Sequence, residues 1–167
     1  AGAIEEDQST MLLGSLDLEQ TQVRQIMTPR VNMVSAQADE GLEAVASRLA
    51  EAGFLRLPVV SGAPDTVVGN VPVRDVAAAY ATGRSDVEAR EIMREAPFES
   101  EAASVSRAFN TMRETGAQLL ILIDEYGSTS GLVTLEDITE EVLGQIQSES
   151  GPQGDDVAVR IGGQLYV

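Results

Sequence analysis

A threonine and an aspartate three residues apart form the motif of this sequence best suited to chemistry. They are Thr134 and Asp137, at the end of the apolar run that begins with Gly131. The pair has the form of a capping box, in which the threonine caps a helix and the carboxylates that follow complement the helix dipole. The same geometry suits a nucleotide, because a helix start and a hydroxyl can donate to phosphate and a nearby carboxylate can accept from ribose. Both interpretations remain open for this segment alone.

The segment that carries the motif occurs twice. The run Arg24-Gln25-Ile26-Met27 recurs as Arg90-Glu91-Ile92-Met93, and residues 69–75 recur as 131–137. Matches in the same order at nearly the same offset indicate a tandem repeat of roughly 60 residues. The first copy departs from the motif, because Pro72 stands where the second copy has Thr134. Proline suits a helix start but offers no hydroxyl. We therefore expect any site built on the corresponding residues of the first copy, Pro72 and Asp75, to be degenerate.

Each copy has the same predicted order of elements. In the first copy, apolar residues at helical spacing predict a helix from Leu42 to Ala50 that Gly53 ends. An extended stretch is expected before it (31–35), and strands at 57–60 and 66–71 lead into a helix at 73–82. The second copy predicts a helix through 105–112 ended by Gly116, strands at 119–123 and 131–134, and a helix through 138–146. Each unit is therefore β-α-β-β-α, an α/β (α+β) fold.

Composition and charge exclude several functions. The chain carries 27 acidic and 11 basic residues, net −16, and every basic residue is arginine. A broad basic face for nucleic acid is therefore not expected. The absence of cysteine and histidine excludes thiolate sites, imidazole ligands and His-based triads. The acidic surface either reflects a high-salt or GC-rich origin, or requires that an anion site concentrate the few arginines or recruit a cation.

The segments outside the repeats are expected to be connections. Residues 1–20 predict an amphipathic helix, and 147–156 have a linker composition. Residues 157–161 predict a strand that opens a further domain, so we expect the chain to be a fragment. No apolar run is long enough to span a membrane.

The repeats resemble paired CBS domains, the Bateman module. More specifically, residues 11–19 with 23–30, and residues 124–138, resemble the CBS pair of CorB/CorC proteins, hemolysin-related prokaryotic relatives of the CNNM magnesium transporters. The resemblance implies four regions: an N-terminal helix or linker from a missing membrane domain (1–22), CBS domain 1 (23–84), CBS domain 2 (85–148), and a linker with the start of a truncated transporter-associated domain (149–167).

The resemblance also implies a function. Such a pair is a non-catalytic regulatory module at the cytoplasmic face of the membrane, where it binds ATP with Mg²⁺, forms a homodimer, and controls Mg²⁺ or Co²⁺ transport by its own transmembrane domain. Two alternatives are a ligand-free structural dimerisation module and a sensor of AMP or another adenosine ligand. An ATP-hydrolysing enzyme ranks last, because the chain offers neither histidine nor cysteine for a nucleophile–base pair.

Five residues match the family's nucleotide-binding pattern. Thr28 matches a contact to the adenine side, Phe54 and Arg56 match an aromatic and an arginine at the nucleotide, and Thr134 and Asp137 match phosphate and ribose contacts. Each also has an ordinary alternative: Thr28 as a turn residue, Phe54 as core, Arg56 as a surface arginine. Two positions depart from the pattern, since Phe54 replaces an expected tyrosine and Leu55 a small residue. Arg30 is a further phosphate candidate that a salt bridge explains equally well. No metal-ligating or catalytic residues are predicted.

Overall fold

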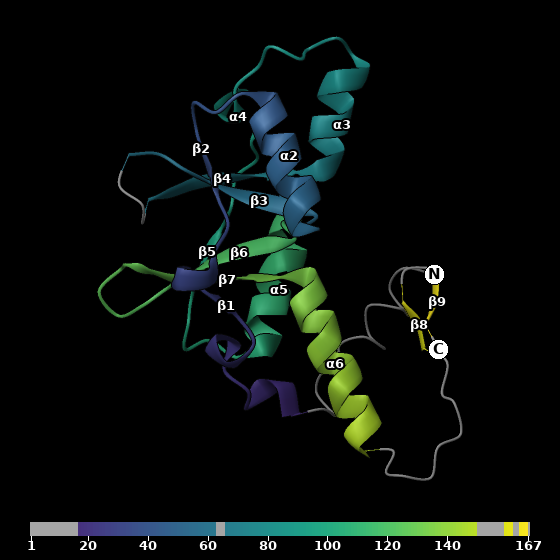
Figure 1. The fold of residues 1–167 in the computed structure, drawn as a ribbon. Helices are drawn as coiled ribbons and strands as arrows, with labels where there is room; N and C mark the ends of the chain where they lie inside the picture. The colour runs from purple at the N-terminus through teal and green to yellow at the C-terminus, as the bar shows by residue number, and fades with distance from the viewer. Residues whose placement is uncertain (1–16, 63–65, 150–158, 162–163, 167) are drawn as a thin grey trace.

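The computed structural model describes residues 17–62, 66–149, 159–161 and 164–166, and most of the residues up to 149 form two similar units (Figure 1). The first unit consists of β2 (Ala36–Gln37), α2 (Leu42–Ala52), β3 (Arg56–Val60), β4 (Val67–Pro72) and α3 (Val73–Ala81). The second consists of β5 (Phe98–Ser100), α5 (Val105–Thr115), β6 (Leu119–Ile123), β7 (Thr129–Thr134) and α6 (Leu135–Glu149). Both units follow the predicted order β-α-β-β-α, which confirms the fold class.

The two central helices begin and end where the sequence predicts. Leu42, Val45 and Leu49 form the buried face of α2, and Gly53 ends that helix with φ 68°, in the left-handed region that glycine adopts without strain. Helix α5 begins at Val105, and the side chain of its N-cap, Ser104, accepts a hydrogen bond from the Arg107 N–H. Local patterning is therefore sufficient to specify these helices.

Each unit contains one mixed sheet, and the two sheets pack face to face. The order is β2-β3-β4 in the first and β1-β7-β6-β5 in the second, where β1 is Thr28–Pro29. In Figure 1 the helices α2 and α3 lie beside the first sheet and α5 and α6 beside the second. Between the sheets, Val60 and Val67 of the first unit pack with Leu119, Ile121 and Leu132 of the second. The helices pack on the outer face of each sheet. They therefore leave the edges of the sheet–sheet interface accessible to a ligand.

The segments that precede each unit pack into the other unit's core. The short 3-10 turns η1 (Asp17–Glu19) and η2 (Val23–Gln25) place Leu18 and Val23 in the core of the second unit. Strand β1 then pairs with β7 through Thr28 and Leu132. Conversely α4 (Ala89–Ile92), which precedes the second unit, contributes to the core of the first. This exchange joins the two units into one body.

The observed fold differs from the predictions mainly at the segment boundaries. Residues 30–32 form the 3-10 turn η3 (Arg30–Asn32) and the strand comes later, at β2, so the extended stretch predicted over 31–35 is wrong in part. Helix α6 reaches Glu149, so the predicted linker at 147–156 begins too early. The predicted helix at 1–20 lies outside the described residues except for η1. Of the predicted strand at 157–161, the described part is β8 (Val159–Ile161), which pairs with β9 (Gln164–Tyr166).

Candidate functional site

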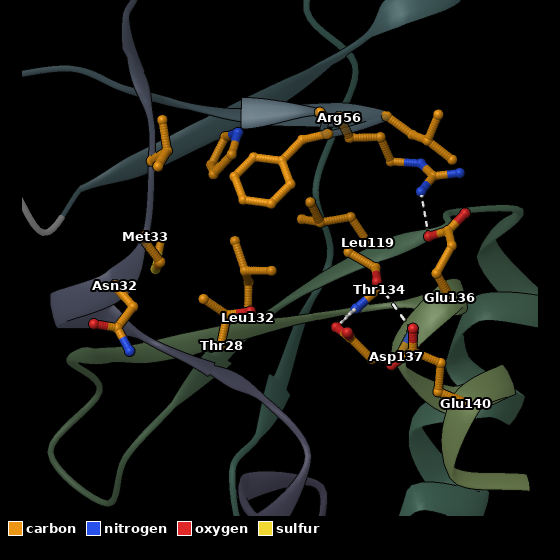
Figure 2. Close-up of a pocket in the computed structure, with 15 residues that line it drawn as sticks. Thr28, Asn32, Met33, Arg56, Leu119, Leu132, Thr134, Glu136, Asp137 and Glu140 are labelled. Atoms are coloured by element: carbon orange, nitrogen blue, oxygen red, sulfur yellow. Dashed lines mark hydrogen bonds and ion pairs between the residues drawn. The ribbon is translucent and has the colours of Figure 1, made fainter. Parts of the chain in front are cut away.

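The five predicted ligand residues line a single cavity between the two units (Figure 2). Its volume is about 340 Å³, within the range of roughly 300–1,000 Å³ typical of small-molecule sites. The first unit's side is the turn from α2 into β3, which carries Phe54 and Arg56, and the second unit's side is the junction of β7 and α6, which carries Thr134 and Asp137. Thr28 enters from β1. The structure thus brings together residues that are more than 100 positions apart in the sequence.

Thr134 and Asp137 form the capping box that their spacing predicts. The Thr134 N–H donates to Oδ2 of Asp137 at 2.9 Å, and the Asp137 N–H donates to Oγ1 of Thr134 at 3.2 Å. This reciprocal pair fixes the first turn of α6. The threonine hydroxyl keeps its own proton to donate, and Oδ1 of Asp137 forms no hydrogen bond with any described residue. A capping role and a ligand role are therefore compatible in the same two side chains.

Arg56 is buried in the wall of the cavity and paired across the interface. Only 10% of its side chain is exposed, and it donates from Nη1 to Oε2 of Glu136 at 2.7 Å and from Nη2 to Oε1 of Gln118. The interpretation as an ordinary surface arginine is therefore wrong. Because both partners belong to the second unit, this guanidinium links the units at the site. An anion that binds Arg56 must compete with Glu136, whose side chain is 46% exposed.

The backbone conformation at Gly53 positions Phe54, and the pairing of β1 with β7 positions Thr28. Phe54 follows the left-handed Gly53 and is 46% exposed, so its interpretation as a core residue is wrong. Thr28 lies in a strand paired with β7 rather than in a simple turn. An added Cβ at Gly131 would lie 2.3 Å from the Thr28 carbonyl oxygen, so only glycine allows β1 to approach β7 this closely. Leu55, beside Phe54, is 52% exposed and also lines the cavity.

Two groups of residues that line the cavity are not among the residues predicted from the sequence. The first is apolar and comes from both units: Met33, Val34, Pro58, Leu119 and Leu132. The second is acidic, Glu136 and Glu140, which lie one turn apart on α6 and are labelled in Figure 2. Glu136 adjoins the predicted motif and was assigned only to the helix dipole. Its partner Arg56 is 80 positions away, so no local pattern could reveal the pairing.

In the first unit, Pro72 and Asp75 occupy the positions that correspond to Thr134 and Asp137, but their contacts differ. Pro72 lies opposite Arg56 in the β3–β4 ladder, as Thr134 lies opposite Leu119 in the β6–β7 ladder, and it provides no side-chain cap for α3. Both carboxylate oxygens of Asp75 accept from Arg94, at 2.5 and 2.9 Å. The hydrogen bonds from Arg94 lower the pKa of Asp75, with burial acting in the opposite direction. This aspartate has no free oxygen of the kind that Asp137 retains.

The described residues contain neither a cluster of metal-ligating side chains nor a helix suited to span a membrane. No group of three or more acidic, histidine or cysteine side chains is arranged to hold a metal ion in that part of the chain. No helix in the same part is both long enough and apolar enough to cross a membrane.

Comparison with known proteins gives consistent similarities. The CBS domain family model matches residues 23–82 and 89–144. The chain is 34% identical to the magnesium and cobalt efflux protein CorC of Vibrio cholerae over 87% of this chain and 50% of that protein, and 34% identical to CorC of Escherichia coli K12 over 91% and 52%. It thus spans about half the length of the curated relatives it matches.

A solved structure adds a likeness in three dimensions. It is the CBS domain of a bacterial CNNM/CorC family Mg²⁺ transporter in complex with ATP. The identity is 32% and the TM-score 0.73, covering 83% of this chain and 99% of that one.

Proposed function

Because the chain belongs to the CBS-domain family, as a CBS pair of the CNNM/CorC type, we propose that it is a regulatory module that binds an adenine nucleotide. Within this proposal the CBS domains are 23–84 and 85–148, preceded by a helix or linker from the membrane domain (1–22) and followed by a linker with the start of a transporter-associated domain (149–167). The observation that carries the proposal is that Thr28, Phe54, Arg56, Thr134 and Asp137 all line one cavity at the junction of the two units. The ATP complex of the similar CNNM/CorC domain supports the choice of nucleotide.

The chemistry of the lining fits a nucleotide. The apolar residues, with Phe54 and Met33 among them, offer a surface on which a base can stack or pack. The unbonded Oδ1 of Asp137 can accept from a ribose hydroxyl, while the Thr134 hydroxyl can donate to a phosphate held at the positive end of the α6 dipole. A ligand that contacts the residues of both units fixes the geometry of one unit relative to the other. Ligand binding can thereby change the conformation of a connected domain.

We propose that the ligand is ATP with Mg²⁺. Glu136 and Glu140 line the same cavity, and the chain carries a net charge of −16. A polyphosphate that enters beside two carboxylates is repelled, and at physiological salt this repulsion is largely screened only at separations beyond about 8 Å. Arg56 supplies one positive charge, and a divalent cation bound to the phosphates supplies two more.

The proposed role is non-catalytic and belongs to a larger protein. The cavity contains no nucleophile–base pair, and the chain has no histidine or cysteine to form one. By the names of its relatives, the parent protein moves magnesium and cobalt ions. We place this module on the cytoplasmic side of that parent, where ATP is available, and propose that nucleotide binding controls transport by the transmembrane domain.

Isothermal titration calorimetry tests the nucleotide proposal. ATP, ADP and AMP are titrated with Mg²⁺ and with excess chelator. The expected result is saturable binding of ATP that weakens strongly without Mg²⁺. Preference for AMP identifies a different adenosine sensor. No heat with any nucleotide favours a ligand-free structural module, an alternative supported by the fact that Arg56, Thr134 and Asp137 already have protein partners.

We also propose that the module forms a homodimer. The apolar residues of α6 contribute little to such an interface, because Ile138 is buried and Leu135, Val142 and Ile146 pack against the core of their own unit. The exposed Val73 and Tyr80 on α3 offer further apolar surface. Sedimentation at several salt concentrations, with and without Mg²⁺-ATP, is the test. A monomer under all conditions at tens of micromolar rules out the dimer for this chain.

A further inference from the structure

A glutamine outside the predicted motif holds Arg56 at the proposed nucleotide cavity. Gln118 lies directly before β6 and is not among the described residues that line this cavity. Its Oε1 accepts a hydrogen bond from Nη2 of Arg56, while Oε2 of Glu136 accepts from Nη1 at 2.7 Å. The second of these bonds is drawn in Figure 2. The guanidinium is therefore held from two sides, by a neutral amide and by a carboxylate, and both belong to the second unit.

The start of α6 fixes the backbone of Gln118. Its carbonyl oxygen accepts from the Leu135 N–H at 2.9 Å, and the next residue, Leu119, lies opposite Thr134 in the β6–β7 ladder. Gln118 is thus anchored to the same turn that carries the capping box of Thr134 and Asp137. A side chain that extends from an anchored backbone can set the direction of the guanidinium that bonds to it.

The first unit makes the same backbone contact without a glutamine. Leu55 follows Gly53 at the distance at which Gln118 follows Gly116, and its carbonyl oxygen accepts from the Val73 N–H at 2.8 Å. The fold therefore requires only the backbone carbonyl at this position and accepts an apolar side chain there. The amide of Gln118 is an addition to this structural contact, and its bond to the arginine of the other unit is what distinguishes the two copies.

The two partners of the guanidinium respond differently to an incoming phosphate. Glu136 carries a negative charge, so a phosphate that reaches Arg56 must displace this carboxylate or be repelled by it. The Gln118 amide is neutral, so it can keep its hydrogen bond while Nη1 exchanges the carboxylate for the phosphate. Arginine presents its donors in one rigid plane. A bond retained at Nη2 therefore also fixes the direction in which Nη1 donates.

We propose that Gln118 is a positioning residue: it stays bonded to Arg56 when a nucleotide binds and directs the Nη1 edge of the guanidinium at the phosphate group. This inference deepens the proposed function and rests on it. It assigns part of the discrimination between a phosphorylated ligand and a bare nucleoside to a side chain that does not touch the ligand. Loss of the amide should therefore reduce the affinity for ligands that carry phosphate and leave the affinity for adenosine unchanged.

Gln118→Met tests the proposal, because methionine keeps the length of the side chain and removes the amide. We expect calorimetry to show Mg²⁺-ATP binding about tenfold weaker than in the wild type, the effect of one misdirected hydrogen bond to a charged group. An NMR titration should show unchanged adenosine binding. Thermal unfolding without ligand should stay close to the wild type, because the backbone bond to Leu135 remains. Gln147→Met, at the exposed far end of α6, is the matched control and should bind both ligands as the wild type does.

A double-mutant cycle with Arg56→Ala separates positioning from direct contact. If Gln118 acts through Arg56, adding Gln118→Met to Arg56→Ala should not change the affinity for Mg²⁺-ATP any further. A further loss in that background, or equal losses for ATP and adenosine in the single variant, means that Gln118 contacts the ligand or shapes the cavity, and overturns the proposal. An unchanged ATP affinity in Gln118→Met overturns it as well and leaves the proposed function intact. If the wild type binds no nucleotide, the proposed function fails and this inference fails with it.

Discussion

Replacing Glu136 with glutamine should strengthen the binding of ATP in the absence of Mg²⁺. In the wild type, Glu136 holds the Arg56 guanidinium at 2.7 Å, so an incoming phosphate must displace a carboxylate to reach its cation. Glu136→Gln removes the negative charge and keeps the size of the side chain. Arg56, which is 10% exposed, then needs a new anionic partner, because a buried charge without one is costly.

The magnitude follows from the exposure of the pair. Two unit charges about 4 Å apart attract with about 4 kcal/mol at an effective dielectric constant of about 20, whereas exposed pairs contribute only about 0.2–1 kcal/mol. One partner here is buried and the other half exposed. A competition of about 1–2 kcal/mol lies between these limits, and it corresponds to about 5–30-fold in affinity.

Calorimetry with excess chelator measures this effect, and thermal unfolding provides a second measurement. Glu136→Gln should bind free ATP about 5–30-fold more tightly than the wild type, and its dependence on Mg²⁺ should decrease. Without nucleotide the variant should unfold at a lower temperature, and ATP should restore its stability. Glu125→Gln, which removes an equal charge from the exposed β6–β7 turn, should behave as the wild type. If folded Glu136→Gln binds free ATP no better than Glu125→Gln, the proposed competition for Arg56 is wrong.

Three further predictions concern Thr134, the close approach of β1 to β7 at Gly131, and stability in acid. Thr134→Val removes the cap of α6, which should cost about 1 kcal/mol in unfolding free energy. We expect the loss in Mg²⁺-ATP binding free energy to be larger than this. Equal losses in calorimetry and in urea unfolding mean that the residue only caps α6. Gly131→Ala should destabilise by about 1–3 kcal/mol or more, since the new methyl would lie 2.3 Å from a carbonyl oxygen of β1, whereas Gly144→Ala on α6, with nothing within 4 Å, should be neutral or stabilising. Hydrogen bonds from Arg48 lower the pKa of Glu40, so this pair stabilises the fold above the carboxyl's ordinary pKa and ceases to do so as pH falls through the lowered value. Urea unfolding between pH 6 and pH 3 should show a shallower acid loss in Glu40→Gln than in the wild type, and identical slopes contradict the assignment.

Much of each unit could be predicted because its signals are local. Apolar residues at helical spacing and the glycines that follow specify α2 and α5, and the structure ends these helices at Gly53 and Gly116, both with positive φ. The repeat predicts the order of elements, and the spacing of Thr134 and Asp137 predicts their reciprocal hydrogen bonds. In each case the interacting groups lie within a few residues of one another, so the neighbouring sequence is sufficient to determine the contact.

The short extended segments were predicted less accurately, because the backbone groups that pair with them are distant in the sequence. The sequence places a strand at 31–35, whereas the chain turns at Arg30–Asn32 and pairs only at β2, two residues long. A two-residue strand has almost no propensity of its own. It exists because β3 offers backbone partners at that position, and those partners are more than 20 residues away.

The sequence by itself therefore determined two β-α-β-β-α units, their helix ends and a capped helix start that suits a phosphate. Only the tertiary structure decided which core each linking segment enters, with β1 in the second sheet and α4 in the first unit. It also decided that Arg56 is held by Glu136 and Gln118. The physical reason is that these contacts depend on how two sheets pack across their apolar faces. Side-chain pairing over that distance in sequence is set by the packing and carries no local pattern.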